Sequence, residues 1–223
     1  MIEVAVIGGG IIGTAIALAL QKEGAAVCVF DPNEAGGGAA AGSAGYISVG
    51  EIFPLAHASL IAQLPHMLFD PLGPLVIRPW YVPHMSPWGI RFLAAMRPAA
   101  YARHTAALAH LNRGALDALE ELARYAGAAG FIDHAGGLLV CEKPETLRSL
   151  ERQLGELLAH GIDARLVGPH ELRALEPSLS PSMAGAMFFA GSARCVDPAA
   201  FGAQLASAAA AYGTSFRRER VAR

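Results

Sequence analysis

Short apolar runs and one longer helical pattern alternate over the first 31 residues. Residues 2–7 are apolar and rich in β-branched side chains, and they stop at a glycine, which predicts a buried parallel strand. Residues 11–23 are rich in alanine and leucine and end at Gly24, which predicts a helix. Residues 27–30 form a second apolar run that ends at Asp31. This order predicts the βαβ unit of a parallel sheet.

The rest of the chain mixes predicted strands and helices without an internal repeat. Residues 36–50 are small and rich in glycine, so we expect a loop that another group approaches closely. Eight prolines between residues 51 and 98 predict irregular structure with short helices at best. Further helices are expected over 99–126, 145–160 and 198–212, and further strands over 136–141, 184–190 and 215–221.

A glycine-rich sequence joins the first predicted strand to the first predicted helix. Gly8, Gly10 and Gly13 fit the G-x-G-x-x-G pattern, with Gly9 inside it. The first glycine permits a tight turn, the second leaves room for a pyrophosphate, and the third lets helix and strand pack closely. Asp31 lies 18 residues beyond Gly13, at the end of the next strand, where it can accept hydrogen bonds from the ribose of adenosine. Together these features predict a dinucleotide site at a helix N-terminus, and the alternative is a structural glycine turn.

Composition and charge exclude several classes of protein. The chain is 53% apolar and 16% charged, which excludes a disordered protein, and its net charge of −2 argues against a nucleic-acid partner. Its three cysteines are far apart, so we expect free thiols and a cytoplasmic setting. Cys195 follows Arg194, which leaves open a lowered thiol pKa beside a purely structural role. The histidines lack metal-ligand spacing, and we predict no metal site, secretory leader or membrane-spanning segment.

Charge is unevenly distributed along the chain. Residues 71–116 contain five arginines and no acidic residue, and aromatic side chains are interleaved with them, namely Trp80, Tyr81, Trp88 and Phe92. One interpretation is a solvated or partner-facing surface. The other is a patch that meets anionic lipid, since aromatic and basic side chains favour the membrane interface.

Several segments together resemble the FAD-dependent D-amino-acid oxidase/dehydrogenase superfamily, most closely the bacterial D-amino-acid dehydrogenases. The resemblance to the superfamily is carried by residues 4–20, Asp31, and the segments 42–48, 171–177 and 196–198. The narrower resemblance to the dehydrogenases is carried by residues 50–56 and 71–79. It implies an α/β fold with a Rossmann-like, glutathione-reductase-like FAD-binding domain built from residues 1–51 and 197–223. Residues 52–196 would then belong to a second, α+β substrate domain that is truncated.

The resemblance also implies where FAD lies. The cofactor would extend along the first βαβ unit, with residues 42–48 beside the flavin ring and a strand around Val221 near the adenine. It identifies no catalytic residue. The expected FAD-binding residues are Ile7, Gly8, Gly9, Gly10, Ile11, Ile12, Gly13, Asp31, Pro32, Ser43, Gly45, Tyr46, Ile47, Ser48 and Val221.

The implied reaction is the oxidation of a D-amino acid to a 2-oxo acid and ammonia, with electrons passing to a quinone or another acceptor. Peripheral contact with the inner face of the cell membrane is part of this expectation. Members of the superfamily are longer, so we expect this chain to be an N-terminal portion that needs a C-terminal half or a second subunit for turnover. Two alternatives stay open: an amine oxidase of the sarcosine or glycine oxidase type, and a non-catalytic flavin-binding subunit.

Overall fold

The computed structural model describes residues 2–70 and 72–222. Contacts divide the chain into two compact units, which we call the first unit (Met1–Gly50 with Arg113–Arg223) and the second unit (Glu51–Asn112). These boundaries differ from those of the expected FAD-binding and substrate domains. It stays a prediction that residues 1–51 and 197–223 form an FAD-binding domain and that residues 52–196 form a substrate domain.

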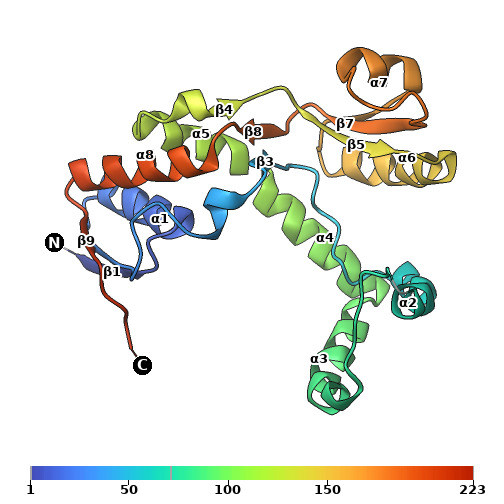
Figure 1. Cartoon of the computed structure of the whole chain (residues 1–223), viewed down its shortest axis with the longest axis horizontal. Helices are drawn as coiled ribbons and strands as arrows, with labels where there is room; N and C mark the ends of the chain where they lie inside the picture. The colour runs from blue at the N-terminus through green and yellow to red at the C-terminus, as the bar shows by residue number, and fades with distance from the viewer. Residues whose placement is uncertain (1, 71, 223) are drawn as a thin grey trace. The chain divides into compact units, whose positions relative to one another are not determined.

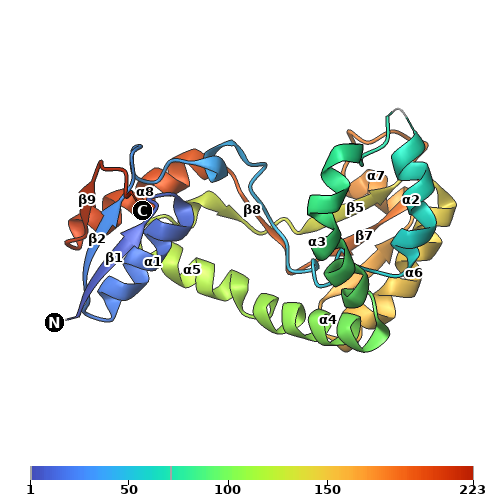
Figure 2. The same ribbon diagram turned by 90° about the horizontal axis from the view of Figure 1, so that it is seen from below.

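A three-stranded parallel sheet organises the first unit around its N-terminus. Its order is β1 (Glu3–Ile7), β2 (Ala26–Phe30) and β9 (Ser215–Arg217), with β2 in the middle. Helices α1 (Ile11–Lys22) and α8 (Pro198–Ala211) pack side by side against it (Figures 1 and 2). The predicted α/β arrangement of strand, helix and parallel strand is therefore confirmed.

The core of this layer follows from the alternation of side chains along β2. Val27 and Val29 face the helices and are buried with Ala17 of α1, whereas Cys28 between them faces the other side of the sheet. Leu18 of α1 and Phe201 of α8 continue the core toward α5 (Ala115–Tyr125). The helices thus cover one face of the sheet and fix the turn that joins β1 to α1.

Two antiparallel sheets complete the first unit. The first has the order β3 (Tyr46–Ile47), β8 (Ala193–Cys195) and β4 (Ile132–Asp133). The second has the order β5 (Gly137–Cys141), β7 (Gly185–Phe189) and β6 (Ala164–Val167), accompanied by α6 (Pro144–Ala159) and α7 (Pro169–Leu175). Short 3-10 turns occur at Ala39–Gly42 and Ala129–Phe131.

The second unit is helical, which corrects the prediction of irregular structure over residues 51–98. It contains α2 (Ser59–Phe69), a 3-10 turn at Pro79–Tyr81, α3 (Val82–Ala95) and α4 (Pro98–Asn112). Pro87 lies inside α3, yet the carbonyl of Pro83 that loses its backbone partner accepts a 2.8 Å hydrogen bond from the Ser86 hydroxyl. The chain thereby compensates for one missing helical hydrogen bond.

Two other predicted elements are shorter than expected. The single helix predicted over 99–126 is two helices, α4 and α5, separated at Arg113 and Gly114 where the two units divide. The strand predicted over 215–221 ends at Arg217, because its partner β2 ends at Phe30, directly opposite Arg217. Val221 therefore lies beyond the strand. Within residues 2–70 and 72–222, no helix combines the length and the apolar character needed to cross a bilayer.

Candidate dinucleotide-binding site

The turn between β1 and α1 can be made only by glycine at two positions. Gly8 has φ +103°, and its amide donates a 2.8 Å hydrogen bond to the carbonyl of Phe30 on β2. A Cβ on Gly13 would lie 1.8 Å from the carbonyl oxygen of Gly8 and 3.3 Å from Val6. The start of the helix thus packs directly on the end of the strand.

The N-terminus of α1 is open to an anion. Its N-cap residue is Gly10, which has no side chain to accept hydrogen bonds from the first turn, and the first helical amide to bond back is that of Thr14, at 2.9 Å from the Gly10 carbonyl. A hollow of about 370 Å³ lies beside this turn, and Gly37, Ala39 and Ala40 line it together with the glycines. The rest of the lining is apolar, namely Val6, Ile7, Ile11, Ile12 and Ile16. The backbone amides and the helix dipole at the turn suit a diphosphate, which the glycines allow to approach the backbone.

Asp31 is held against the glycine turn by backbone amides. Its Oδ2 accepts a 2.7 Å hydrogen bond from the Gly9 amide, and its Oδ1 accepts one of 2.7 Å from the Asn33 amide. The bond from Asn33, followed by that from Gly9, lowers the pKa of the Asp31 carboxyl below its usual value. The ionised carboxylate keeps a further lone pair on each oxygen with which to accept a hydroxyl.

A smaller hollow of about 130 Å³ adjoins Asp31 at the carboxyl ends of β2 and β9. Arg217 and Arg218 line it, and the Arg218 Nε donates a 3.3 Å hydrogen bond to the carbonyl of Pro32. The predicted residues from Ile7 to Gly13, Asp31 and Pro32 therefore share one edge of the parallel sheet. Sequence analysis gave Arg218 no role in the site and placed it inside the strand predicted over 215–221, whereas it lies just after β9.

The glycine loop that follows β2 packs between the turn and α8. The Gly36 amide donates a 2.7 Å hydrogen bond to the carbonyl of Gly9. A Cβ on Gly36 would lie 2.2 Å from the carbonyl of Gly202 in α8, and one on Gly202 would lie 2.3 Å from that of Gly36. Sequence analysis gave Gly202 no role, although a glycine inside an alanine-rich helix was an available signal.

The five residues expected beside the flavin ring lie away from this turn, since Ser43, Gly45, Tyr46, Ile47 and Ser48 line neither hollow. The carbonyl of Gly45 accepts a 2.7 Å hydrogen bond from the Cys195 amide, and the Tyr46 hydroxyl donates one of 3.2 Å to Ser192. The segment is thus fixed to β8.

Val221 is 48% exposed and also lines neither hollow. The expected roles of Val221 and of residues 42–48 toward the cofactor stay predictions.

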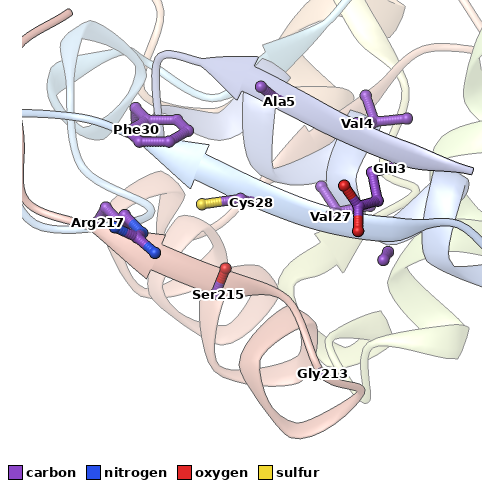
Figure 3. Close-up of a pocket in the computed structure, with 10 residues that line it drawn as sticks. Glu3, Val4, Ala5, Val27, Cys28, Phe30, Gly213, Ser215 and Arg217 are labelled. Carbon is purple, nitrogen blue, oxygen red and sulfur yellow. The ribbon is translucent and has the colours of Figure 1, made fainter.

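A larger hollow of about 550 Å³ lies on the face of the parallel sheet away from α1 and α8 (Figure 3). Cys28, Ser215 and Arg217 extend from neighbouring strands along it. None of the predicted site residues lines this hollow, so it is separate from the glycine turn.

The cysteines behave as structural thiols. Cys28, Cys141 and Cys195 are all free, and the last two are buried. Burial raises the pKa of the Cys195 thiol, so the lowered pKa considered from its neighbour Arg194 is wrong. Desolvation is the largest cause, and the charge of the Asp197 carboxylate raises the pKa further. The Arg194 guanidinium lies 3.8 Å from the Asp133 carboxylate, with which it pairs.

The chain matches the family described as "DAO: FAD dependent oxidoreductase" over residues 3–223, and it belongs to this family. It is 34% identical over 224 residues to a D-amino-acid oxidase of Bradyrhizobium diazoefficiens, covering 98% of this chain and 52% of that protein. It is 29% identical to a D-amino acid dehydrogenase of Xylella fastidiosa, covering 96% and 50%. The chain thus spans about half the length of these relatives.

Solved structures agree on the fold. A glycine oxidase from Geobacillus kaustophilus superposes with a TM-score of 0.60 at 24% identity, covering 97% of this chain and 47% of that one. An L-alpha-glycerophosphate oxidase from Mycoplasma pneumoniae, solved with FAD bound, gives 0.56 at 17%, covering 97% and 45%. The resemblance to FAD-dependent oxidoreductases and the fold class predicted from the sequence are therefore confirmed.

The residues present fit FAD, on which this family depends. Gly8 and Gly13 make a turn that no larger residue can make, and the helix that begins there presents uncapped amides to the hollow of about 370 Å³. Asp31, ionised and anchored beside the turn, suits the ribose hydroxyls.

Proposed function

We propose that this chain forms the FAD-binding part of an enzyme that oxidises the CH–NH2 group of D-amino acids to 2-oxo acids and ammonia. The observation that carries the proposal is the hydrogen bond from the Gly9 amide to Asp31, which holds this carboxylate beside an uncapped helix N-terminus, where it would bind the ribose. The D-amino-acid oxidase at 34% identity and the D-amino acid dehydrogenase at 29% support the substrate class.

Each part of the proposed site has its own task. The amides of Ile11, Ile12 and Gly13 would hold the diphosphate, and Asp31 the adenosine ribose. FAD, when bound, supplies the acceptor for the two electrons removed from the substrate. The segment 42–48, held on β8, would border the flavin ring and limit the access of water.

The reaction has a simple balance. The Cα–H bond of the amino acid breaks with loss of a hydride equivalent, and the amine loses a proton, which leaves an imino acid. Water then hydrolyses the imino acid to a 2-oxo acid and ammonia. The electrons pass onward to a quinone or another acceptor, and a D-amino acid is the small-molecule partner.

The test measures bleaching of the flavin absorbance under anaerobic conditions. Two preparations are compared: the FAD-loaded chain alone, and the protein purified from its native cells with any polypeptide that copurifies. Because the chain spans about half of each relative, we expect D-amino acids to bleach the second preparation and not the first. The L-enantiomers serve as controls and should leave the flavin oxidised.

Other results would favour the alternatives. Bleaching by glycine or sarcosine in place of D-amino acids would indicate an amine oxidase of that type. Tight FAD binding with no reduction by any of these compounds, in either preparation, would indicate a flavin-binding subunit without catalysis. Failure to bind FAD at all would overturn the proposal, because FAD binding is its first requirement.

A further inference from the structure

The end of β9 is bonded to the turn that carries Asp31. The Asp31 amide donates a 3.1 Å hydrogen bond to the carbonyl of Arg217, the last residue of β9. The Arg218 Nε donates a 3.3 Å hydrogen bond to the Pro32 carbonyl, which joins residues 186 positions apart. The side chain of Arg217 extends along the larger hollow (Figure 3), so the side-chain contact from this segment to the turn comes from Arg218.

This contact acts on the same peptide group that holds the Asp31 carboxylate. The Pro32 carbonyl and the Asn33 amide belong to one planar peptide group and point in opposite directions. The carbonyl accepts the hydrogen bond from Arg218, and the amide donates the 2.7 Å hydrogen bond to Oδ1 of Asp31. A rotation of this peptide group would break both bonds. Arg218 therefore resists the rotation that would release the carboxylate.

The charge of the guanidinium strengthens the arrangement. A hydrogen bond from an ionised donor is stronger than one between neutral groups, and hydrogen bonds in a chain polarise one another. The bond to the Pro32 carbonyl therefore makes the Asn33 amide a better donor to Asp31. That amide is also the largest cause of the lowered pKa of the Asp31 carboxyl. Since proline has no amide hydrogen, its carbonyl is the backbone group through which Pro32 can be held.

We propose that Arg218 is a positioning residue for FAD, whose Nε–H fixes the Pro32–Asn33 peptide group so that this group orients the Asp31 carboxylate toward the ribose. The inference rests on the proposed function, in which Asp31 binds the ribose. Arg218 also lines the hollow of about 130 Å³ beside Asp31, so its positive charge could attract FAD without any positioning. The variants must therefore separate the hydrogen bond from the charge.

Glutamine and methionine at position 218 make this separation. In glutamine the amide nitrogen follows Cδ, as Nε does in arginine, so Arg218→Gln keeps an N–H donor at this place and loses the charge. Arg218→Met places a methyl group there and loses both. In fluorescence titrations of the full chain with FAD, we expect Arg218→Met to weaken binding by about five-fold, the loss of one hydrogen bond, and Arg218→Gln to keep most of the affinity. Arg220→Gln, which removes an exposed arginine of the same segment, is the control for charge and should leave the affinity unchanged.

A second measurement uses the chain without FAD. The pKa of the Asp31 carboxyl, followed by NMR, reports the hydrogen bonds from Asn33 and Gly9 that lower it. We expect Arg218→Met to raise this pKa toward its usual value and Arg218→Gln to leave it low. A residue that only stabilises the fold would change the urea midpoint and leave this pKa as it is.

Three results would overturn the proposal. They are equal FAD affinity of Arg218→Met and the wild type, equal losses of affinity in Arg218→Gln and Arg218→Met, and an unchanged pKa of Asp31 in Arg218→Met. Equal losses would assign the effect to charge. Failure of the wild-type chain to bind FAD would instead refute the proposed function, and the pKa measurement would still decide whether Arg218 holds the carboxylate.

Discussion

The helices of the two units differ in how far they bury their apolar residues. In the first unit, backbone meets backbone at Gly13 and Gly8, and Leu18 and Phe201 are almost fully buried. In the second unit, α2 and α3 contain no buried residue, and Trp80 is 71% exposed. The second unit also has twice as many arginines as acidic residues, whereas the first holds 13 of the chain's 17 basic and 17 of its 19 acidic residues.

This difference separates two kinds of constraint on the sequence. The first unit must fix a turn within a few tenths of an ångström so that amides and a carboxylate meet one ligand. The second unit has no such turn, and its helices α2 and α3 contain no buried residue, so close packing constrains their side chains less. Substitutions should therefore change folding and cofactor affinity more in the first unit than in these two helices.

Gly13→Ala should give the largest effect, and Gly89→Ala in α3 is its counterpart in the second unit. The new Cβ at position 13 would lie 1.8 Å from the Gly8 carbonyl, so either the turn or the helix must shift. We expect a loss of about 3 kcal/mol in the free energy of unfolding, the upper end of the usual cost of overpacking, together with loss of bound flavin. Urea unfolding, followed by circular dichroism, and flavin absorbance measure the two effects.

A Cβ on Gly89 would meet no heavy atom within 4 Å, and the residue lies inside α3, so its replacement by alanine reduces only the backbone entropy of the unfolded chain. We expect Gly89→Ala to raise stability by about 0.5–1 kcal/mol and to leave flavin content unchanged. Similar effects of the two substitutions would contradict the distinction between the units.

How far the sequence predicts this structure depends on whether the signal is local. Every end of the β1–α1–β2 unit is predicted to within one residue, because its apolar runs and glycines lie next to one another. The reciprocal packing of Gly36 and Gly202 joins residues 166 positions apart, and no local pattern shows which residue each glycine packs against. Sequence analysis therefore finds the turn, its carboxylate and helix α8 itself, but misses the contact by which α8 supports the turn.

The second unit departs from its sequence prediction for a different reason. Proline normally disrupts a helix, which predicts irregular structure over residues 51–98, but the Ser86 hydroxyl replaces the bond that Pro87 removes. Residues 43–48 could be placed only by their tertiary partner β8, a strand of three residues, Ala193–Cys195, that is too short to recognise from its pattern.

Asp31→Asn should give the next largest effect, on the cofactor more than on the fold. The amide can accept on one atom only, so one of the two backbone bonds and the negative charge are lost. We expect FAD affinity at neutral pH to fall by at least about ten-fold, the equivalent of one charge-assisted hydrogen bond. Fluorescence titration measures it, with Asp163→Asn, which lines neither hollow, as the control. Unchanged affinity would remove Asp31 from the site.

The same substitution has a defined pH dependence. Because the folded pKa of Asp31 is depressed, its contribution to stability is complete above the unfolded pKa of about 3.9 and is lost as the pH falls through the folded value. The difference in unfolding free energy between the wild type and Asp31→Asn should be constant from neutral pH down to about pH 5 and shrink below about pH 4. A difference that grows on acidification would contradict the hydrogen bonds to Gly9 and Asn33.

Asp197→Ala should give the smallest loss of stability, and it compares how helices begin in the two units. Asp197 has an extended backbone (φ −144°, ψ 92°), and its Oδ1 accepts a 2.9 Å hydrogen bond from the Ala200 amide at the start of α8. Its loss should cost about 1 kcal/mol in urea unfolding. In the second unit, the N-cap residue of α2 is Ala58, whose backbone is helical (φ −61°, ψ −33°). Ala58→Ser should therefore gain little, because a hydroxyl there is not oriented to cap the amides. The contrary result is that Ala58→Ser raises the free energy of unfolding by as much as Asp197→Ala lowers it. That result would show that α2 accepts the same kind of cap as α8, so that the two units do not differ at their helix ends.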